Sequence, residues 1–227
     1  MVKYINDLPI QVSEIEGICY VSSWSKFMLS KMPDKLDNLI VCDYGSGTGI
    51  LGIAAILKGA SKVTAIEKNF SFIEIMKHNF YENSVSEKIY IVTSSENIST
   101  SEVFDYIFCN PACYPSVVGS DSFFYAGDLG IDMIDEVILF ASKRLEKKGH
   151  LLILIPSISP ISLVFRHLKN LGLCWRVVDS KYVALRKHLC DKIKLFVDKN
   201  SKVYPEMCYF EKNGEFFERV DLYDIFF

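Results

Sequence analysis

The chain has 227 residues, half of them hydrophobic, which suffices for one domain with a sizeable core and excludes an intrinsically disordered protein. Its formal net charge of -3 gives no overall attraction to phosphate, although residues 181–202 are locally basic. The longest apolar runs, residues 53–57 and 151–155, are far shorter than the roughly 20 residues that cross a bilayer, so we expect no membrane span.

The first 37 residues are too few for an independent domain, and we expect them to form an N-terminal flap or lid on a main domain of residues 38–227. Within the flap, the polar residues 20–25 predict a serine-capped start to a helix over residues 26–32. The N-terminus has acidic residues and no apolar block of the kind that a secretory signal needs. A cytoplasmic location is therefore expected.

From residue 39 onward, short β-branched runs alternate with helical patterns, which is typical of a parallel sheet with helices on both faces. Strands are predicted over residues 39–44, 62–67, 88–92, 104–110 and 150–156. Helices are predicted over residues 50–58, 71–79, 132–147 and 159–171. This alternation indicates an α/β, doubly wound, mostly parallel sheet of seven strands.

The C-terminal tail is expected to finish the sheet with antiparallel strands. Residues 174–178 and 192–197 have strand-like patterns, and residues 206–211 and 215–222 flank Asn213 and Gly214. An Asn-Gly pair between two strand-like runs is a strong hairpin signal. We therefore predict an antiparallel C-terminal hairpin.

The first predicted strand runs into three alternate glycines, Gly45, Gly47 and Gly49. Glycines let such a turn take positive φ and bring its backbone N–H groups against a ligand. Asp43 precedes the loop and Glu67 ends the second strand, where an acidic side chain can accept both ribose hydroxyls of an adenosine. The spacing differs from the Gly-x-Gly-x-x-Gly that admits a pyrophosphate, and Asp43 suits a ligand with an ammonium group. The alternative interpretation is a tight strand-to-helix turn without a ligand.

Over about residues 38–156 this pattern resembles the first and second motifs of the class I S-adenosylmethionine-dependent methyltransferases, which have a Rossmann-like fold. The resemblance implies that the methionine part of S-adenosylmethionine lies over the loop with Asp43 nearby, and that Glu67 holds the ribose. The implied loop contacts are Gly45, Ser46, Gly47 and Gly49. After the third strand, where that superfamily often has an acidic residue against the adenine, this chain has Ser94 and Ser95 and then Glu96, so either serine would take that place or Glu96 would reach back to the adenine.

The fourth predicted strand ends in Asn110, Pro111, Ala112, Cys113, Tyr114 and Pro115. This segment resembles the Asn-Pro-Pro-Tyr motif of methyltransferases that act on a glutamine amide, the amine of adenine, or guanine. It departs from the motif because Ala112 replaces the second proline and Tyr114 is displaced by one residue. Residues 125–132 and 149–153 are similar to the corresponding segments of the release-factor glutamine methyltransferases, so the chain resembles the HemK-like, small-domain group.

The resemblance and the side-chain chemistry together predict Asn110, Pro111 and Tyr114 as the catalytic residues. An asparagine amide and the neighbouring Pro111 carbonyl can bind a planar NH₂ group and aim its lone pair, and Asn110 would also lie against the cofactor. If the aromatic residue of this motif stacks on the acceptor, then the displaced Tyr114 must turn toward it or the acceptor differs. The alternative to a catalytic role is that Asn110 and Pro111 only end a strand.

Several functions remain open for the whole chain. The acceptor could be a protein, a nucleic acid or a small molecule, and a small-metabolite N- or O-methyltransferase is one alternative. Another is a catalytically silent binding module that acts as the partner of another subunit. The glycine spacing disfavours a nicotinamide-dependent oxidoreductase. The seven cysteines are scattered and suggest reduced thiols, and no metal site is expected.

Overall fold

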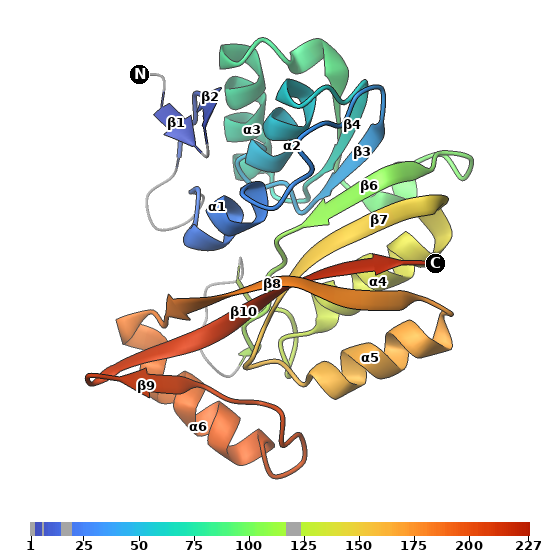
Figure 1. Cartoon of the computed structure of the whole chain (residues 1–227). Coiled ribbons are helices and arrows are strands. Elements are labelled where there is room, and N and C mark those ends of the chain that lie inside the picture. Colours follow the sequence, from blue (N-terminus) through green and yellow to red (C-terminus); the bar gives the residue numbers. More distant parts are fainter. Residues whose placement is uncertain (1–2, 6, 15–19, 117–123) are drawn as a thin grey trace. The chain divides into compact units, whose positions relative to one another are not determined.

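The computed structural model describes residues 3–5, 7–14, 20–116 and 124–227 (Figure 1). Parts of the predicted flap, residues 1–2, 6 and 15–19, therefore lie outside the described residues. The chain divides into two compact units. The first contains Met1–Asn110, Lys143–Leu152 and Phe226, and the second contains Pro111–Ser142, Ile153–Ile225 and Phe227.

The first unit begins with a small antiparallel pair, β1 (Lys3–Ile5) and β2 (Leu8–Ile10), and the short helix α1 (Ser23–Leu29). α1 starts three residues earlier than predicted because Ser22 caps it, with the Ser22 Oγ accepting the Ser25 N–H at 3.0 Å. The assignment of residues 1–37 to a lid stays a prediction.

The first unit contains four parallel strands in the order β5-β4-β3-β6. Their bounds are β3 (Ile40–Tyr44), β4 (Lys62–Ile66), β5 (Ile89–Val92) and β6 (Phe104–Cys109), each close to its prediction. β3 and β4 are buried along nearly their whole length, which is typical of a parallel sheet. In the register, Tyr44 pairs with both Ile66 and Cys109, and Ile66 pairs with Val92, so the carboxyl ends of the four strands are aligned.

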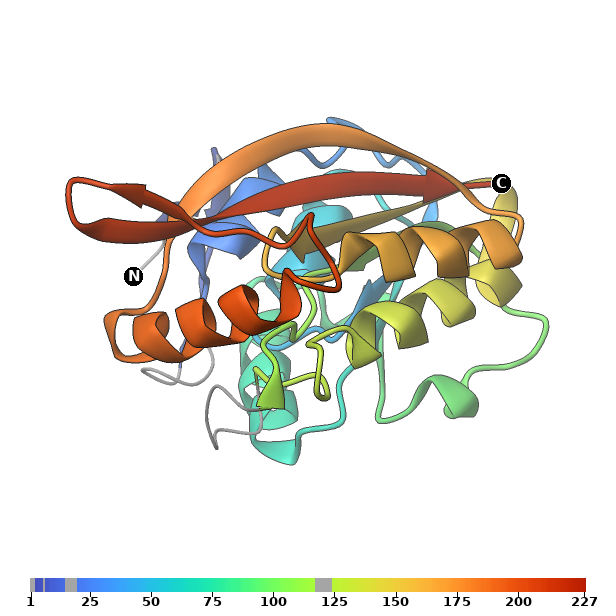
Figure 2. The same cartoon turned by 90° about the horizontal axis from the view of Figure 1, so that it is seen from below.

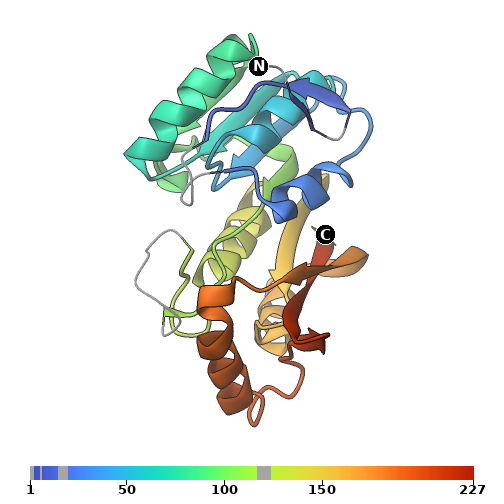
Figure 3. The same ribbon diagram turned by 90° about the vertical axis from the view of Figure 1, so that its left-hand side faces the viewer.

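Helix α2 (Ile50–Leu57) follows β3, and helix α3 (Phe70–Glu82) follows β4. The short turns η1 (Ser86–Lys88) and η2 (Ser95–Asn97) flank β5. α2 is almost completely buried and contacts β3 and β4. α1 lies beside α2 (Figure 3). α1 therefore contacts the helix that begins directly after the glycine loop.

Strand β7 (Leu145–Pro156) runs through both units, and the second unit continues the sheet in the order β7-β10-β8. Its other elements are α4 (Asp132–Arg144), α5 (Ile161–Asn170), β8 (Cys174–Ala184), η4 (Lys187–Leu189), α6 (Cys190–Asn200), β9 (Phe210–Lys212) and β10 (Glu215–Phe226). α4 and α5 lie side by side, with His167 Nδ1 2.9 Å from Asp135 Oδ1 (Figure 2).

The mostly parallel α/β sheet and the antiparallel C-terminal hairpin are confirmed, but the sheet has eight strands and not seven. The eighth strand is the three-residue β9, which pairs with β10 beside the path of the other seven strands and is shorter than the predicted 206–211. Asn213 and Gly214 form the hairpin turn with φ of 54° and 75°, as their sequence requires.

The predicted strand over residues 192–197 is wrong, because these residues belong to α6. Ile193, Phe196 and Val197 are all buried on this helix. Their spacing of three and four residues puts them on one helical face, and burying that face outweighs the local alternation of lysine and apolar residues.

None of the helices in the described residues is long and apolar enough to cross a membrane. The cysteines in this part of the chain are free thiols, of which Cys42, Cys109 and Cys113 are buried, whereas Cys19 lies outside the described residues.

Candidate functional site

The glycine loop follows β3 and is fixed to the neighbouring strand. The backbone N–H groups of Gly45 and Ser46 both donate to the Ile66 carbonyl, at 2.9 and 3.0 Å. Gly45, Gly47 and Gly49 have φ of 73°, 53° and 78°, a left-handed conformation that only glycine adopts without strain. The three alternate glycines thus reflect a backbone requirement.

Gly47 and Gly49 have different surroundings. A Cβ atom at Gly49 would lie 2.4 Å from the Phe80 ring and 2.8 Å from the Met76 side chain, so this glycine allows α3 to approach the loop. A Cβ atom at Gly47 would meet nothing within 4 Å. The loop is therefore packed on one side and open at its middle glycine, which fits a ligand lying over Gly47.

Asp43 lies under the loop and is completely buried. Its Oδ2 accepts the Gly52 N–H at 3.0 Å, and its other carboxylate oxygen, Oδ1, has no hydrogen-bond partner among the described residues. Burial raises the pKa of this carboxyl to about 7, and the Gly52 hydrogen bond opposes the rise. A buried, unpaired carboxyl oxygen fits a cationic ligand group such as an ammonium.

Ser46, predicted as a loop contact, donates its hydroxyl to the Asp43 backbone carbonyl at 2.8 Å and is buried. Its side chain therefore stabilises the turn, and its backbone N–H is already bonded to Ile66.

Glu67 follows β4 and lies against the loop. Its Oε2 accepts the Gly47 N–H at 2.9 Å, and its Oε1 accepts the Asn69 N–H at 2.8 Å. Because each carboxylate oxygen has two acceptor positions, both can still accept a ligand hydroxyl. Glu67 thus connects the middle of the glycine loop with Asn69, the residue that caps α3.

Ser94 and Ser95 follow β5, the strand next to β4, and both are half-buried. The Ser94 Oγ accepts the Glu96 N–H at 3.2 Å and caps η2. Glu96 itself is exposed. The aligned strand ends place these serines on the same edge of the sheet as Glu67.

Asn110 follows β6 directly, and Gly45 follows β3 directly. Because Tyr44 and Cys109 are register partners, Asn110 and the glycine loop leave adjacent strands at the same level. The Asn110 side-chain Nδ2 donates to the Ser25 Oγ of α1 at 3.1 Å. We did not predict a site role for Ser25, although the sequence indicates that it lies at the serine-capped start of a helix.

Pro111 and Tyr114 belong to the second unit. Pro111 is buried, and the backbone of Tyr114 is held by hydrogen bonds to Phe124 and Ala126 at 2.9 and 3.0 Å. The Tyr114 hydroxyl donates to the buried Glu218 Oε1 at 3.0 Å. Nothing in the sequence signals this partner, which lies 104 residues further along the chain.

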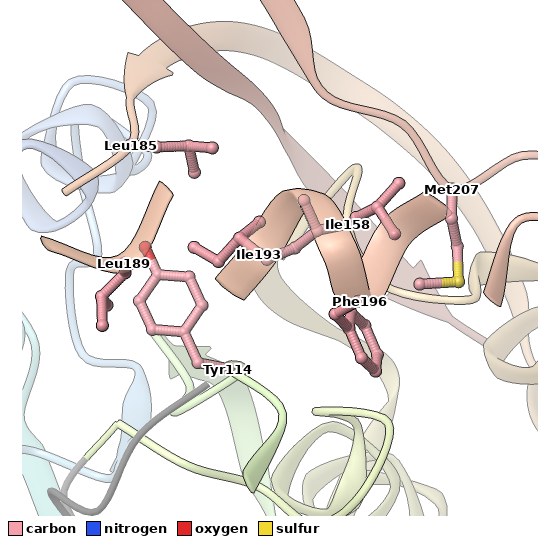
Figure 4. Packing of buried hydrophobic residues seen from close by; sticks show 8 residues of the cluster. Tyr114, Ile158, Leu185, Leu189, Ile193, Phe196 and Met207 are labelled. Carbon is pink, nitrogen blue, oxygen red and sulfur yellow. The ribbon is translucent and has the colours of Figure 1, made fainter. Parts of the chain in front are cut away.

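The ring of Tyr114 is part of a hydrophobic cluster of the second unit, next to Leu189 and Ile193 (Figure 4). The buried members of this cluster are Tyr114, Ile158, Leu185, Leu189, Ile193, Phe196, Val197 and Met207. Only 8% of Tyr114 is exposed, so packing accounts for most of its surface. Stacking of Tyr114 on an acceptor stays a prediction, and this conformation leaves little of the ring for it.

Glu218 has an unusual environment for an acidic residue. Burial raises its pKa to about 8, while the Tyr114 hydrogen bond and the positive charge of Arg186 oppose the rise. Its Oε2 has no hydrogen-bond partner among the described residues. In residues 3–5, 7–14, 20–116 and 124–227, no three His, Cys, Asp or Glu side chains are grouped to hold a metal ion.

Comparison with known proteins identifies methyltransferases. A family model described as ribosomal protein L11 methyltransferase (PrmA) matches residues 27–112. A tRNA1(Val) (adenine(37)-N6)-methyltransferase of Shewanella baltica is 33% identical over 76 residues, covering 31% of this chain and 32% of that relative. The chain thus spans about a third of the length of this relative.

Two longer matches extend over most of the chain. A protein of Methanocaldococcus jannaschii, provisionally named as a protein N5-glutamine methyltransferase, is 29% identical over 174 residues, covering 71% of this chain and 87% of that one. The structure of a ribosomal protein L11 methylase from Lactobacillus delbrueckii subsp. bulgaricus aligns with a TM-score of 0.56 and 13% identity, covering 95% of this chain and 86% of the other. At that identity the structural match supports the fold alone.

Proposed function

We propose that the chain is a class I S-adenosylmethionine-dependent methyltransferase of the HemK-like group, and that it methylates a planar nitrogen, either a protein glutamine amide or a nucleobase amine. The observation that carries this proposal is the strand register, which aligns the end of β6, followed by Asn110, with the end of β3, followed by the glycine loop. S-adenosylmethionine, the methyl donor of this family, supplies an electrophilic methyl group on a sulfonium.

Residues of the first unit fit the donor. Asp43 offers an unpaired buried oxygen, and Gly47 offers an open backbone surface. Glu67 lies against Gly47 and keeps acceptor positions for ribose hydroxyls. We assign Asp43, Gly45, Ser46, Gly47, Gly49 and Glu67 to donor binding, with Ser46 acting through the shape of the turn and Ser94 or Ser95 on the adenine side.

Asn110 is assigned to the acceptor. Its side-chain Oδ1 can take one N–H of a planar NH₂ group, and the carbonyl of Pro111 can take the other. A nitrogen held in this way cannot turn its lone pair away from the methyl group, so most of the rate would come from orientation and no strong base is needed. Tyr114 is better explained as a buried anchor of the segment after Asn110, given its bond to Glu218.

The small-metabolite and silent-module alternatives are less well supported. The two relatives described above are named for nitrogen acceptors, one in tRNA and one in protein. A silent module would not need an open Gly47 next to a ribose-type acid. The acceptor, a partner subunit and a cytoplasmic location stay predictions.

The test compares Asn110→Ala with the parent protein. Binding of S-adenosylhomocysteine is measured by calorimetry, and transfer is measured with radiolabelled donor on bulk tRNA, glutamine-containing peptides and extracted metabolites. We expect Asn110→Ala to keep its affinity for S-adenosylhomocysteine within about two-fold and to lose at least about 100-fold in transfer. Parental transfer rates in this variant would contradict the nitrogen assignment and favour an oxygen or small-metabolite acceptor.

A further inference from the structure

Helix α1 is connected to the candidate acceptor-binding residue through one buried hydroxyl. Ser25, in the first turn of α1, is only 7% exposed, and its Oγ receives the Asn110 Nδ2–H at 3.1 Å across 85 residues of sequence. The Ser25 backbone N–H donates to the Ser22 Oγ at 3.0 Å, and the two serine hydroxyl oxygens are 3.1 Å apart. Ser25 is therefore held by the helix cap on one side and holds Asn110 on the other.

Fixing one end of an asparagine amide fixes the other. The C=O and NH₂ ends have almost the same shape and opposite hydrogen-bonding roles, and rotation about the terminal torsion is broad in the absence of partners. When Ser25 takes the Nδ2–H, the Oδ1 of Asn110 points away from Ser25 and remains an acceptor. An asparagine that presents its carbonyl can bind an N–H donor, whereas one that presents its NH₂ group would repel it.

The helix that carries Ser25 is itself well anchored. Trp24, Phe27, Met28 and Leu29 are buried, and α1 contacts α2, the helix that starts after Gly49. The Ser25 hydroxyl is thus held by a helix that packs against α2, the helix that follows the glycine loop.

We propose that Ser25 is a positioning residue that orients the Asn110 amide so that its carbonyl faces the acceptor nitrogen. This inference rests on the proposed function, because it assumes that Asn110 binds the acceptor. It also assigns a task to the N-terminal segment, which contributes to acceptor binding through α1. Ser25 does not itself have to touch the acceptor.

The first test needs no acceptor. In ¹⁵N-labelled protein, the side-chain NH₂ signals of Asn110 are identified by their loss in Asn110→Ala. Ser25→Ala should shift these signals and speed their hydrogen exchange several-fold, and Ser25→Thr, which keeps the hydroxyl, should restore both. Ser30→Ala is the matched control, because Ser30 follows the same helix and donates to the Phe27 carbonyl at 2.7 Å. Unchanged Asn110 signals in a folded Ser25→Ala protein would overturn the proposal.

The second test separates positioning from the proposed function itself. With an acceptor in hand, Ser25→Ala should lower kcat by about 10- to 100-fold, with smaller changes in acceptor KM, and Ser25→Thr should recover most of the loss. If Asn110→Ala abolishes transfer but Ser25→Ala does not reduce kcat, positioning by Ser25 is refuted and the proposed function stands. If Asn110→Ala transfers normally, the proposed function fails, whatever Ser25 does to the amide signals.

Discussion

The buried carboxyl of Asp43 should make the stability of the protein depend on pH. Its pKa rises from the ordinary 3.8 to about 7 because the group is completely removed from water. Asp43→Asn keeps the size of the side chain and abolishes its titration. We therefore expect the difference in unfolding free energy between the variant and the parent protein to change with pH.

The sign and size follow from linkage between proton binding and folding. Between about pH 4 and pH 7 the folded parent protein keeps a proton that the unfolded chain has lost, so each pH unit costs the parent about 1.4 kcal/mol. The contribution of Asp43 to the unfolding free energy is thus fully present below the pKa of this group in the unfolded chain. It is lost as the pH rises through the pKa of the group in the folded protein. Over about three pH units, the advantage of Asp43→Asn should grow by about 4 kcal/mol and then level off.

The assay is urea unfolding of both proteins at intervals between about pH 3.5 and about pH 8, without ligand. A constant cost of the substitution, such as a weaker bond to the Gly52 N–H, cancels because only the change in the difference with pH is used. Asp34→Asn, at an exposed position, controls for the change in net charge. A difference that stays constant over this range would refute the argument.

Three further substitutions test the site and its surroundings. Gly47→Ala should lower the unfolding free energy by about 1 to 2 kcal/mol, because the φ of Gly47 is 53°. It should also weaken S-adenosylhomocysteine binding at least about ten-fold, because the new methyl group occupies the open face of the loop. Unaltered affinity in calorimetry would argue against this binding mode. Glu67→Ala should weaken S-adenosylhomocysteine binding by about 1.5 to 3 kcal/mol. Glu67→Gln should restore part of this binding free energy, because its amide oxygen can still accept the Gly47 N–H. Equal affinities in the parent protein and both variants would show that Glu67 does not bind the ligand. Tyr114→Phe should lower the unfolding free energy by about 1 to 3 kcal/mol, because the buried Glu218 loses its hydroxyl donor, and should leave ligand affinity unchanged; a variant as stable as the parent in urea would contradict the bond.

The sequence predicted those parts of the fold that depend on local requirements. The glycine loop and the Asn213-Gly214 turn were predictable because positive φ is a property of single residues. The α6 helix was not, since residues 192–197 alternate lysine and apolar side chains over their first four positions, a pattern that fits a strand as well as a helix, and only burial of Ile193 and Phe196 on one face decides.

The candidate site shows the same division. Asp43, Glu67 and Asn110 follow or end strands, so their common edge could be predicted from the α/β alternation. Ser25 and Glu218 could not be predicted, because each is paired with a residue 85 or 104 positions away and no local pattern encodes that distance. Tyr114 resembles a motif residue in the sequence, but its burial depends on α6 and on residues far from it along the chain.

One buried side chain of α3, that of Asn79, connects the N-terminal segment to the glycine loop through hydrogen bonds. The Asn79 amide donates to the Thr48 carbonyl at 2.9 Å and to the Ser13 carbonyl at 3.1 Å, and its Oδ1 accepts the Ser13 N–H at 2.7 Å. Trimming the chain past Ser13 would leave a buried amide half unsatisfied directly behind the loop. Hydrogen exchange of the Ser13 amide proton can therefore report ligand binding at the loop, because a ligand that restrains Thr48 should increase the protection of this proton. The measurement does not require methyl transfer.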